Sequence, residues 1–337
     1  MTKQIEVVGG SRVYVGNVEE LLQSLLPEKR VIVISDTNID RTHHDIIAAY
    51  EHILIGQGEQ AKSFSTLEEI YRQLIDMGAD RSTFILGVGG GIVTDIAGFV
   101  ATTYMRGVEF GFVTTTLLGS VDASVGGKNG VNVGGFKNMV GTFSQPKFVV
   151  CDVSLLHSLP SREFRAGLAE VLKTAILGDA ELFDILERTS FDELRGDDAL
   201  LEDVILHSVQ VKASIVAEDE REGGRRRVLN LGHTLAHAIE KCSRKYNHGE
   251  AVAIGLFHTT RSALAQNLIS EKDADRIFAL IERYGFSTEL PVEHKQLLKA
   301  IEGDKKRKGN SIHLIYPTKI GDVVDKVVTF ADLAKVL

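Results

Sequence analysis

A change of pattern near Pro160 constrains the fold more than any other feature of the chain. Before it, short runs of β-branched and aromatic residues alternate with segments of helical periodicity, which predicts a mainly parallel sheet with helices on both faces. After it, residues 161–300 show the periodicity of successive amphipathic helices. The runs predicted as strands are VIVIS (31–35), HILIG (52–56), TFILGVG (83–89), GVEFGFVTTT (107–116), KFVVCD (147–152) and, alone in the second half, SIHLIYP (311–317).

This pattern predicts two domains, since 337 residues exceed the size at which one hydrophobic core usually keeps growing. We expect an α/β domain over residues 1–155 and a helical domain over residues 156–337. In the first, STLEEIYRQLIDMGA (65–79) is predicted as a helix that begins with a capping box of Ser65 and Glu68. In the second, helices are predicted over 162–177, 198–220, 227–242 and 249–268.

Composition narrows the class of protein. A net charge of −8 argues against a general nucleic-acid partner, although local lysines and arginines can still hold a small anion. The two cysteines, Cys151 and Cys242, form no CxxC pair, which favours a reducing, cytoplasmic setting over a disulfide framework. The N-terminus has no apolar signal region. The most apolar stretch, 84–104, contains glycines and Asp95, so we expect no membrane span.

A glycine loop, GVGGGIVTD (87–95), follows one predicted strand and opens a helix. In a parallel α/β sheet this is where backbone N–H groups bind a phosphate, although a tight strand-to-helix turn gives the same pattern. We expect Asp95 in the first turn of that helix. There its carboxylate would interact with the helix dipole, or with a neutral sugar or amide of a dinucleotide.

A polar strip over residues 114–141 carries Asp122, Lys128, Asn129, Lys137 and Asn138 among glycines and valines. One interpretation is a solvated hairpin. We favour a partly buried strip, because apolar residues interleave with the polar ones and buried lysines need an anionic partner. Basic runs at 221–230 and 303–310 are most simply solvated loops, or they complete an anion cage with Lys128, Lys137, Lys173 and Lys212.

Two histidines, His233 and His237, stand four residues apart in NLGHTLAHAIE (230–240), and Glu240 follows on the same helical face. They could share a zinc ion, or they could be core histidines that happen to align. His248 precedes a further helix and could complete a set of ligands with Glu170.

Many motifs, in order along nearly the whole chain, give it a specific resemblance to the 3-dehydroquinate synthase family. They are DTN (36–38), GEQAKS (58–63), GGGIVTDIAGFVATTYMRG (89–107), TTLLGSVDASVGGKNGVN (115–132), KNMVG (137–141), GLAEVLK (167–173), VKASIVAEDEREGG (211–224), NLGHTLAHAIE (230–240), HGEAVAIGL (248–256) and DKK (304–306).

The resemblance implies an N-terminal Rossmann-like α/β domain that binds NAD and an α-helical C-terminal domain that binds zinc or cobalt. It also implies an active site in the cleft between them and a homodimer without nucleic-acid or membrane partners. The implied metal ligands are Glu170, His233 and His248, with His237 near the substrate and Glu240 an ordinary helix-end carboxylate. The implied NAD-binding residues are Asp36, Asn38, Gln57, Gly58, Glu59, Gln60, Ala61, Lys62, Gly90, Gly91, Ile92, Val93, Thr94, Asp95, Thr115, Thr116, Lys128 and Lys137.

The implied substrate is a seven-carbon sugar acid phosphate, 3-deoxy-D-arabino-heptulosonate 7-phosphate. NAD would oxidise one hydroxyl, phosphate would leave, and NADH would return the hydride before the carbocycle closes. The implied catalytic and substrate-binding residues are Asp122, Lys128, Lys137, Asn138, Lys173, Lys212, Arg226, Asn230, His237 and Lys306, with Arg106 reaching the neighbouring subunit's substrate.

Two alternatives stay open at this point: another sugar phosphate cyclase, and a metal-dependent polyol dehydrogenase that shares the fold. The chain departs from the family pattern without losing a charged or ligating group. The departures are Thr114 in place of a usual Pro, Asn129 in place of Thr, the glycines of VNVGGFKN, and Ala236 in place of Gly.

Overall fold

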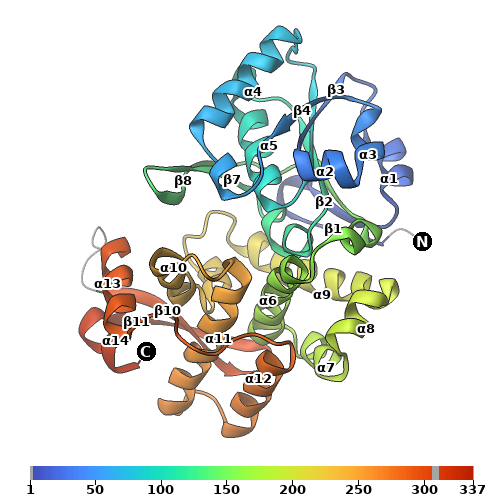
Figure 1. The fold of residues 1–337 in the computed structure, drawn as a ribbon. Helices are drawn as coiled ribbons and strands as arrows, with labels where there is room; N and C mark the ends of the chain where they lie inside the picture. The colour runs from blue at the N-terminus through green and yellow to red at the C-terminus, as the bar shows by residue number, and fades with distance from the viewer. Residues whose placement is uncertain (1–2, 306–310, 337) are drawn as a thin grey trace. The chain divides into compact units, whose positions relative to one another are not determined.

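The structure is a computed structural model that describes residues 3–305 and 311–336. The chain divides into two compact units (Figure 1). The first unit comprises Met1–Pro160 and Lys212–Arg221, and the second comprises Ser161–Val211 and Glu222–Leu337. The chain therefore passes from one unit to the other three times.

The first unit is built on a seven-stranded sheet in the order β1-β2-β9-β6-β5-β3-β4. All neighbouring strands pair in parallel except β1 and β2, which confirms the predicted parallel-rich sheet. The sequence pattern missed β1 and β2, since each has only four residues and too few side chains to show a period. The strands are β1 (Lys3–Glu6), β2 (Arg12–Val15), β3 (Val31–Asp36), β4 (Glu51–Ile55), β5 (Phe84–Gly89), β6 (Phe110–Thr114) and β9 (Phe148–Cys151).

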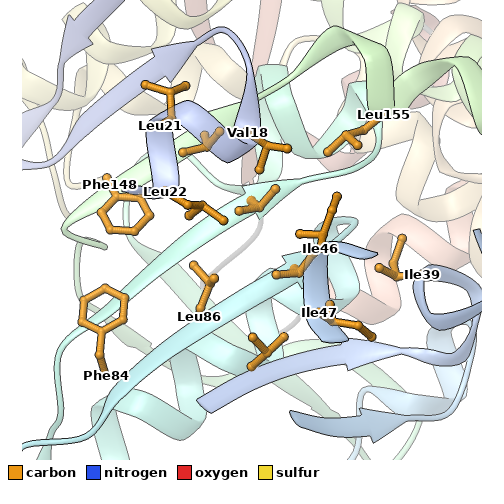
Figure 2. Close-up of a cluster of buried hydrophobic side chains, with 14 residues drawn as sticks. Val18, Leu21, Leu22, Ile39, Ile46, Ile47, Phe84, Leu86, Phe148 and Leu155 are labelled. Atoms are coloured by element: carbon orange, nitrogen blue, oxygen red, sulfur yellow. The ribbon is translucent and has the colours of Figure 1, made fainter. Parts of the chain in front are cut away.

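Helices cover both faces of this sheet. On one face, Figure 2 shows apolar side chains of α1 and α3 packed over β5 and β9, with the Phe84 and Phe148 rings stacked 5.7 Å apart. On the other face α5 lies against Gly87, where an added Cβ would come 2.8 Å from the Cβ of Ala97. The helices of this unit are α1 (Val18–Leu25), α2 (Thr37–Thr42), α3 (His44–Ala48), α4 (Phe64–Asp76) and α5 (Gly91–Thr103).

The start of α4 differs from the prediction. Its N-cap is Ser63, whose hydroxyl accepts a hydrogen bond from the backbone N–H of Thr66. The capping box predicted from Ser65 and Glu68 was wrong because the helix begins two residues earlier, so Ser65 already lies inside the first turn. The apolar stripe was predicted correctly, and Leu67, Ile70 and Leu74 are buried.

The polar strip forms a short π-helical turn, η4 (Gly119–Ala123), and then a hairpin of β7 (Lys128–Val133) and β8 (Phe136–Phe143). The hairpin turns at Gly134 and Gly135, whose φ values of 58° and 81° suit a tight two-residue turn. Most of β8 is exposed, as are Lys128 and Lys137, so the expectation of buried lysines was wrong. The solvated-hairpin interpretation holds for β8 and its turn, whereas residues 114–127 and 129–131 are mostly buried, so the strip is partly buried as expected.

The second unit is mainly helical. One predicted helix, 227–242, is interrupted, because Gly232 adopts a left-handed φ of 77° between a 3₁₀ segment, η6 (Arg225–Asn230), and α10. The late strand is confirmed as β10 (Ser311–Lys319), and its antiparallel partner β11 (Asp322–Thr329) was missed. Its helices are α6 (Ser161–Gly178), α7 (Ala180–Arg188), α8 (Phe191–Gly196), α9 (Asp198–Glu218), α10 (His233–Cys242), α11 (His248–Ala265), α12 (Glu271–Arg283), α13 (His294–Lys305) and α14 (Phe330–Val336).

Across the described residues, none of the helices combines the length and the apolar character needed to cross a membrane.

Candidate functional site

Three helices of the second unit bring Glu170, His233 and His248 together. Glu170 lies in the middle of α6, while His233 and His248 are the first residues of α10 and α11. Glycines allow the helices to approach this closely. A Cβ on Gly249 would overlap the backbone of Ala166 in α6, and one on Gly255 would overlap the carbonyl oxygen of Gly232.

The three side chains form a candidate metal centre. One ligand atom of each lies within 4.8 Å of the other two. Nε2 of His233 and Nε2 of His248 lie 3.3 and 3.1 Å from the same Oε1 atom of Glu170. Ligands bound at about 2.0–2.1 Å in tetrahedral geometry would lie roughly 3.3 Å apart, so this spacing fits zinc or a similar ion. Two imidazoles and one carboxylate also leave a fourth position open, as in catalytic zinc sites.

Electrostatics keep the carboxylate of Glu170 charged although it is fully buried. Burial raises the pKa of this group, but Lys173, whose Nζ lies 2.5 Å from Oε2, and His233 outweigh that effect and hold the pKa well below its usual range. At His248 burial opposes protonation, yet the neighbouring carboxylates of Glu170 and Glu240 raise the pKa to about 10. The proton on His248 supplies a positive charge beside Glu170, and a bound divalent cation would replace that charge.

Groups behind the ligands orient the imidazoles. Nδ1 of His233 lies 3.1 Å from the carbonyl oxygen of Leu231, which leaves Nε2 to face Glu170. Nδ1 of His248 lies 3.6 Å from Oε2 of Glu240, whose side chain is only 9% exposed. The expectation that Glu240 is an ordinary helix-end carboxylate was therefore wrong. The ring of His237 lies one turn further along α10, with its centroid 5.5 Å from that of His233, and His237 is not part of the cluster.

The predicted cofactor-binding residues of the first unit gather where adjacent parallel strands end. β3 ends at Asp36, β5 leads into the glycine loop and β6 leads into Thr115 and Thr116. From β3 the chain moves outward to β4 and then returns to β5 on the other side, so β3 and β5 flank a topological switch point. Ligands of open α/β sheets bind at such points.

The glycine loop leaves room for an anion at the start of α5. Gly90 is the N-cap, no side chain caps the helix and its first turn contains no acidic residue, so its N–H groups face no competing carboxylate. A side chain at Gly90 or Gly91 would come 2.8 Å from Thr116 or Ala123. Asp36 itself caps α2, where its carboxylate accepts from the N–H groups of Asn38 and Ile39.

Asp95 was predicted in the first turn of α5 and was placed wrongly, since it is the fifth residue of the helix. Its carboxylate instead forms an ion pair with the buried Lys62, and Nζ of Lys62 also lies 2.5 Å from Oδ1 of Asn138. Burial raises the pKa of Asp95, and Lys62 opposes that rise.

The other predicted residues occupy varied positions. Nζ of Lys212 donates to both the carbonyl oxygen and Oδ1 of Asp122, at 2.6 and 2.7 Å. Arg226 is buried in η6, and the side chain of Asn230 donates to Glu222 at 2.7 Å. Arg106 is exposed with a left-handed φ of 70°, and Lys306 lies outside the described residues. The side chain of Gln57 donates to Thr37, which follows Asp36, at 2.8 Å.

Known proteins resemble the whole chain. A family model described as 3-dehydroquinate synthase N-terminal matches residues 52–166, and one described as 3-dehydroquinate synthase C-terminal matches residues 167–307. The 3-dehydroquinate synthase of Acaryochloris marina is 38% identical over 96% of this chain and 92% of its own length. That of Pelobacter propionicus is 45% identical over 81% of this chain and 77% of its own length.

Solved structures show the same fold. A 2-deoxy-scyllo-inosose synthase complexed with carbaglucose-6-phosphate, NAD⁺ and Co²⁺ has a TM-score of 0.89, with 26% identity over 100% of this chain and 99% of that chain. A 2-epi-5-epi-valiolone synthase from Streptomyces hygroscopicus with NAD⁺ and Zn²⁺ bound has a TM-score of 0.87, with 27% identity over 99% and 96%. A probable glycerol dehydrogenase from Sinorhizobium meliloti, 18% identical with a TM-score of 0.61, shares the fold alone.

Proposed function

The chain belongs to the 3-dehydroquinate synthase family, and from this premise we propose which of its residues carry out the family's reaction. It converts 3-deoxy-D-arabino-heptulosonate 7-phosphate to 3-dehydroquinate and phosphate, as a lyase that depends on NAD and a divalent metal ion. The structural observation that carries the assignment is the Glu170–His233–His248 cluster, which suits the Zn²⁺ or Co²⁺ found in the related cyclases.

Glu170, His233 and His248 would hold the metal, and Glu240 would orient His248. When bound, the metal supplies Lewis acidity to a substrate oxygen and NAD supplies a reversible acceptor for hydride. Lys173 keeps Glu170 ionised at the base of the site, since its Nζ lies 2.5 Å from Oε2. The contribution of the protein is thus a charged ligand set fixed in position before the substrate arrives.

The dinucleotide would bind at the carboxyl edge of β3, β5 and β6. The uncapped start of α5 offers N–H groups to its pyrophosphate, and the missing side chains of Gly90 and Gly91 allow the backbone to approach. The other proposed NAD-binding residues lie on segments that begin at this edge or follow its strands. They are Asp36, Asn38, Thr115, Thr116 and the loop of Gln57–Lys62.

Basic and amide side chains would bind the anionic substrate. Lys212 is buried and already held by Asp122, so its ammonium group is fixed in orientation before binding. Lys128, Lys137 and Asn138 lie on the exposed hairpin, and Arg226 and Asn230 on η6. Lysines and arginines in such numbers suit a substrate that carries both a phosphate and a carboxylate.

A substrate panel tests this assignment against its two alternatives. Protein supplied with zinc and NAD should release phosphate from 3-deoxy-D-arabino-heptulosonate 7-phosphate without net formation of NADH. Phosphate release only from sedoheptulose 7-phosphate or glucose 6-phosphate would favour another sugar phosphate cyclase. Stoichiometric NADH from glycerol would favour a polyol dehydrogenase.

A homodimer is supported by apolar side chains exposed on β8. Phe136, Met139 and Phe143 are 53%, 61% and 47% exposed, which is unusual for three large apolar side chains on one strand of a monomer. Arg106, which is exposed just beyond the C-terminal end of α5, would contribute to the substrate site of the second subunit. Light scattering after size-exclusion chromatography should give twice the mass of the 36.9 kDa chain, and a monomeric mass at working concentrations would contradict the proposal.

A cytoplasmic location is supported by the cysteines. Cys151 and Cys242 are both free, and burial raises the pKa of the Cys151 thiol to about 11. A buried thiol that stays protonated is stable in a reducing compartment and serves no disulfide.

A further inference from the structure

Asn132, near the end of β7, joins the proposed cofactor loop (Gln57–Lys62) to the β7–β8 hairpin. Its backbone N–H donates to the carbonyl oxygen of Lys62 at 2.9 Å, and its Nδ2 donates to Oε1 of Glu59 at 2.7 Å. Its Oδ1 accepts from the backbone N–H of Asn138 at 2.9 Å. One residue thus directs two hydrogen bonds to the loop and a third to the opposite strand of the hairpin.

Asn138 depends on these contacts for its conformation. It is exposed, on a strand whose residues are mostly exposed, and it adopts a left-handed φ of 53°. Among residues other than glycine, asparagine adopts this backbone most readily, and neighbouring groups hold it there. Those groups are the side chain of Asn132 and Nζ of Lys62, which lies 2.5 Å from Oδ1 of Asn138. Hydrogen bonds, not apolar packing, therefore set the position of the Lys137–Asn138 pair.

Further contacts lie at the two ends of the loop, where Gln57 donates to Thr37 and Lys62 pairs with Asp95. Gln57, Gly58, Glu59 and Gln60 are all exposed, and only Ala61 and Lys62 are buried. Within the described residues, this loop is linked to the hairpin by the contacts from Asn132 to Glu59 and Lys62 and by the contact of Lys62 with Asn138. A ligand that orders the loop would therefore also order the hairpin through Asn132.

We propose that Asn132 is a positioning residue that couples the cofactor loop to the hairpin, so that NAD and the anionic substrate each strengthen the binding of the other. The inference rests on the proposed function, which assigns NAD to the loop and the substrate anion to Lys137 and Asn138. Coupling of this kind is reciprocal and typically changes affinity by roughly 5- to 150-fold. Asn132 itself touches neither ligand in this scheme and acts through Asn138 and the loop.

The first experiment compares four variants with the wild-type enzyme. Asn132→Ala removes both side-chain links. Asn132→Asp keeps an acceptor for the N–H of Asn138 but loses the donor and places a second carboxylate against Glu59. Glu59→Gln keeps an acceptor for Nδ2 of Asn132. Asn17→Ala is the matched control. Asn17 lies in the same unit at the N-cap of α1, where its side chain also accepts a hydrogen bond from a backbone N–H, that of Glu20.

The measurement is the KM of the substrate at low and at saturating NAD, together with kcat. For the wild type we expect the substrate KM to fall as NAD saturates. For Glu59→Gln, a change in the proposed cofactor loop, the readout is this ratio of KM values and not the affinity for NAD, and the ratio should persist. For Asn132→Ala the ratio should move towards one with kcat little changed, while the backbone contact to Lys62 and the Lys62–Asn138 contact remain. Asn132→Asp should lie between them. Asn17→Ala should lower the urea midpoint and leave the ratio unchanged.

A second experiment measures the affinity for NAD by calorimetric titration of the protein, with and without inorganic phosphate. This measurement of the coupling does not depend on turnover. If the wild type releases no phosphate from its substrate, the proposed function fails, while this titration still tests the coupling. Loss of the NAD–phosphate coupling in Asn132→Ala supports the inference. Coupling of unchanged size in Asn132→Ala, no coupling in the wild type, or an equal loss of coupling in Asn17→Ala overturns it.

Discussion

At the scale of single residues, the metal centre shows how one carboxylate can serve two histidines. Oε1 of Glu170 is the atom that both Nε2 atoms face, while Oε2 is occupied by Lys173. The side chain is therefore fixed at both oxygens and cannot rotate without breaking a charged contact. A ligand fixed in this way loses little entropy when a metal ion binds.

His237 is predicted to act on the substrate and not on the metal. Replacing it with alanine should lower kcat by roughly 10- to 100-fold and leave one metal ion per chain. Replacing His233 with alanine should instead remove the metal, because its Nε2 faces Glu170. Metal content by atomic emission, measured beside kcat, separates the two effects. Stoichiometric loss of zinc from His237→Ala would show that both histidines of the helix are ligands.

His258 is predicted to make the protein sensitive to acid. It is buried, its Nε2 faces the carbonyl oxygen of Thr288, and burial lowers its pKa to about 4, with Arg261 and His294 adding to that effect. Since the unfolded value is about 6.5, the folded state binds this proton more weakly than the unfolded state. The contribution to stability is therefore complete above pH 6.5 and is lost as the pH falls towards 4.

Urea unfolding from pH 7 to pH 4 tests this, with His258→Gln as the comparison, since glutamine keeps a donor for Thr288. The free energy of unfolding of the wild type should fall by on the order of 2–3 kcal/mol more than that of the variant over this range. Parallel curves for the two proteins would show that other groups cause the acid sensitivity.

At the scale of elements, the packing of α11 against α6 and α10 decides whether the ligands meet. Gly249→Ala should destabilise the protein by roughly 1–3 kcal/mol and weaken metal binding, because the new Cβ has no room beside Ala166. Gly196→Ala, at the end of α8, is a matched control, since a Cβ there meets nothing within 4 Å. Thermal unfolding would measure the stability, and zinc titration would measure the metal affinity. Equal stability and equal metal affinity of the two variants would contradict the packing argument.

The sequence predicted the helices and strands whose apolar pattern extends over many residues. It missed those that are short or exposed. α4, α5 and the strands β3 to β6 follow from their apolar patterns. β1 and β2 were missed because each has four residues, and β11 because its residues are mostly half-exposed or exposed. The break before His233 depends on the left-handed φ of Gly232, which a periodic helical pattern conceals.

The candidate site was predicted in the same uneven way. Spacing alone left His233 and His237 as equal candidates, and the resemblance to the family was needed to choose Glu170 and His248 as partners. Asn132 and Glu240 were not recognised, because their roles depend on contacts between segments that lie far apart in the sequence or on adjacent helices. For Glu240 a signal was present, since it shares a helical face with His233 and His237.

At the scale of the whole molecule, the two units should respond to different ligands. Hydrogen exchange should show that zinc protects α6, α10 and α11, while NAD protects the ends of β3 and β5 and the start of α5. Removal of the metal by a chelator should lower the unfolding temperature, and zinc should restore it in proportion to its free concentration. Protection by zinc centred on the glycine loop of β5 would contradict this division.

The return of residues Lys212–Arg221 to the first unit limits how this chain can be rearranged. A single cut near residue 160 would separate Asp122 from Lys212, its partner at 2.7 Å. Neither fragment would then contain the whole first unit. A single crossover near residue 160 would therefore build the first unit from two parents, with Asp122 from one and Lys212 from the other.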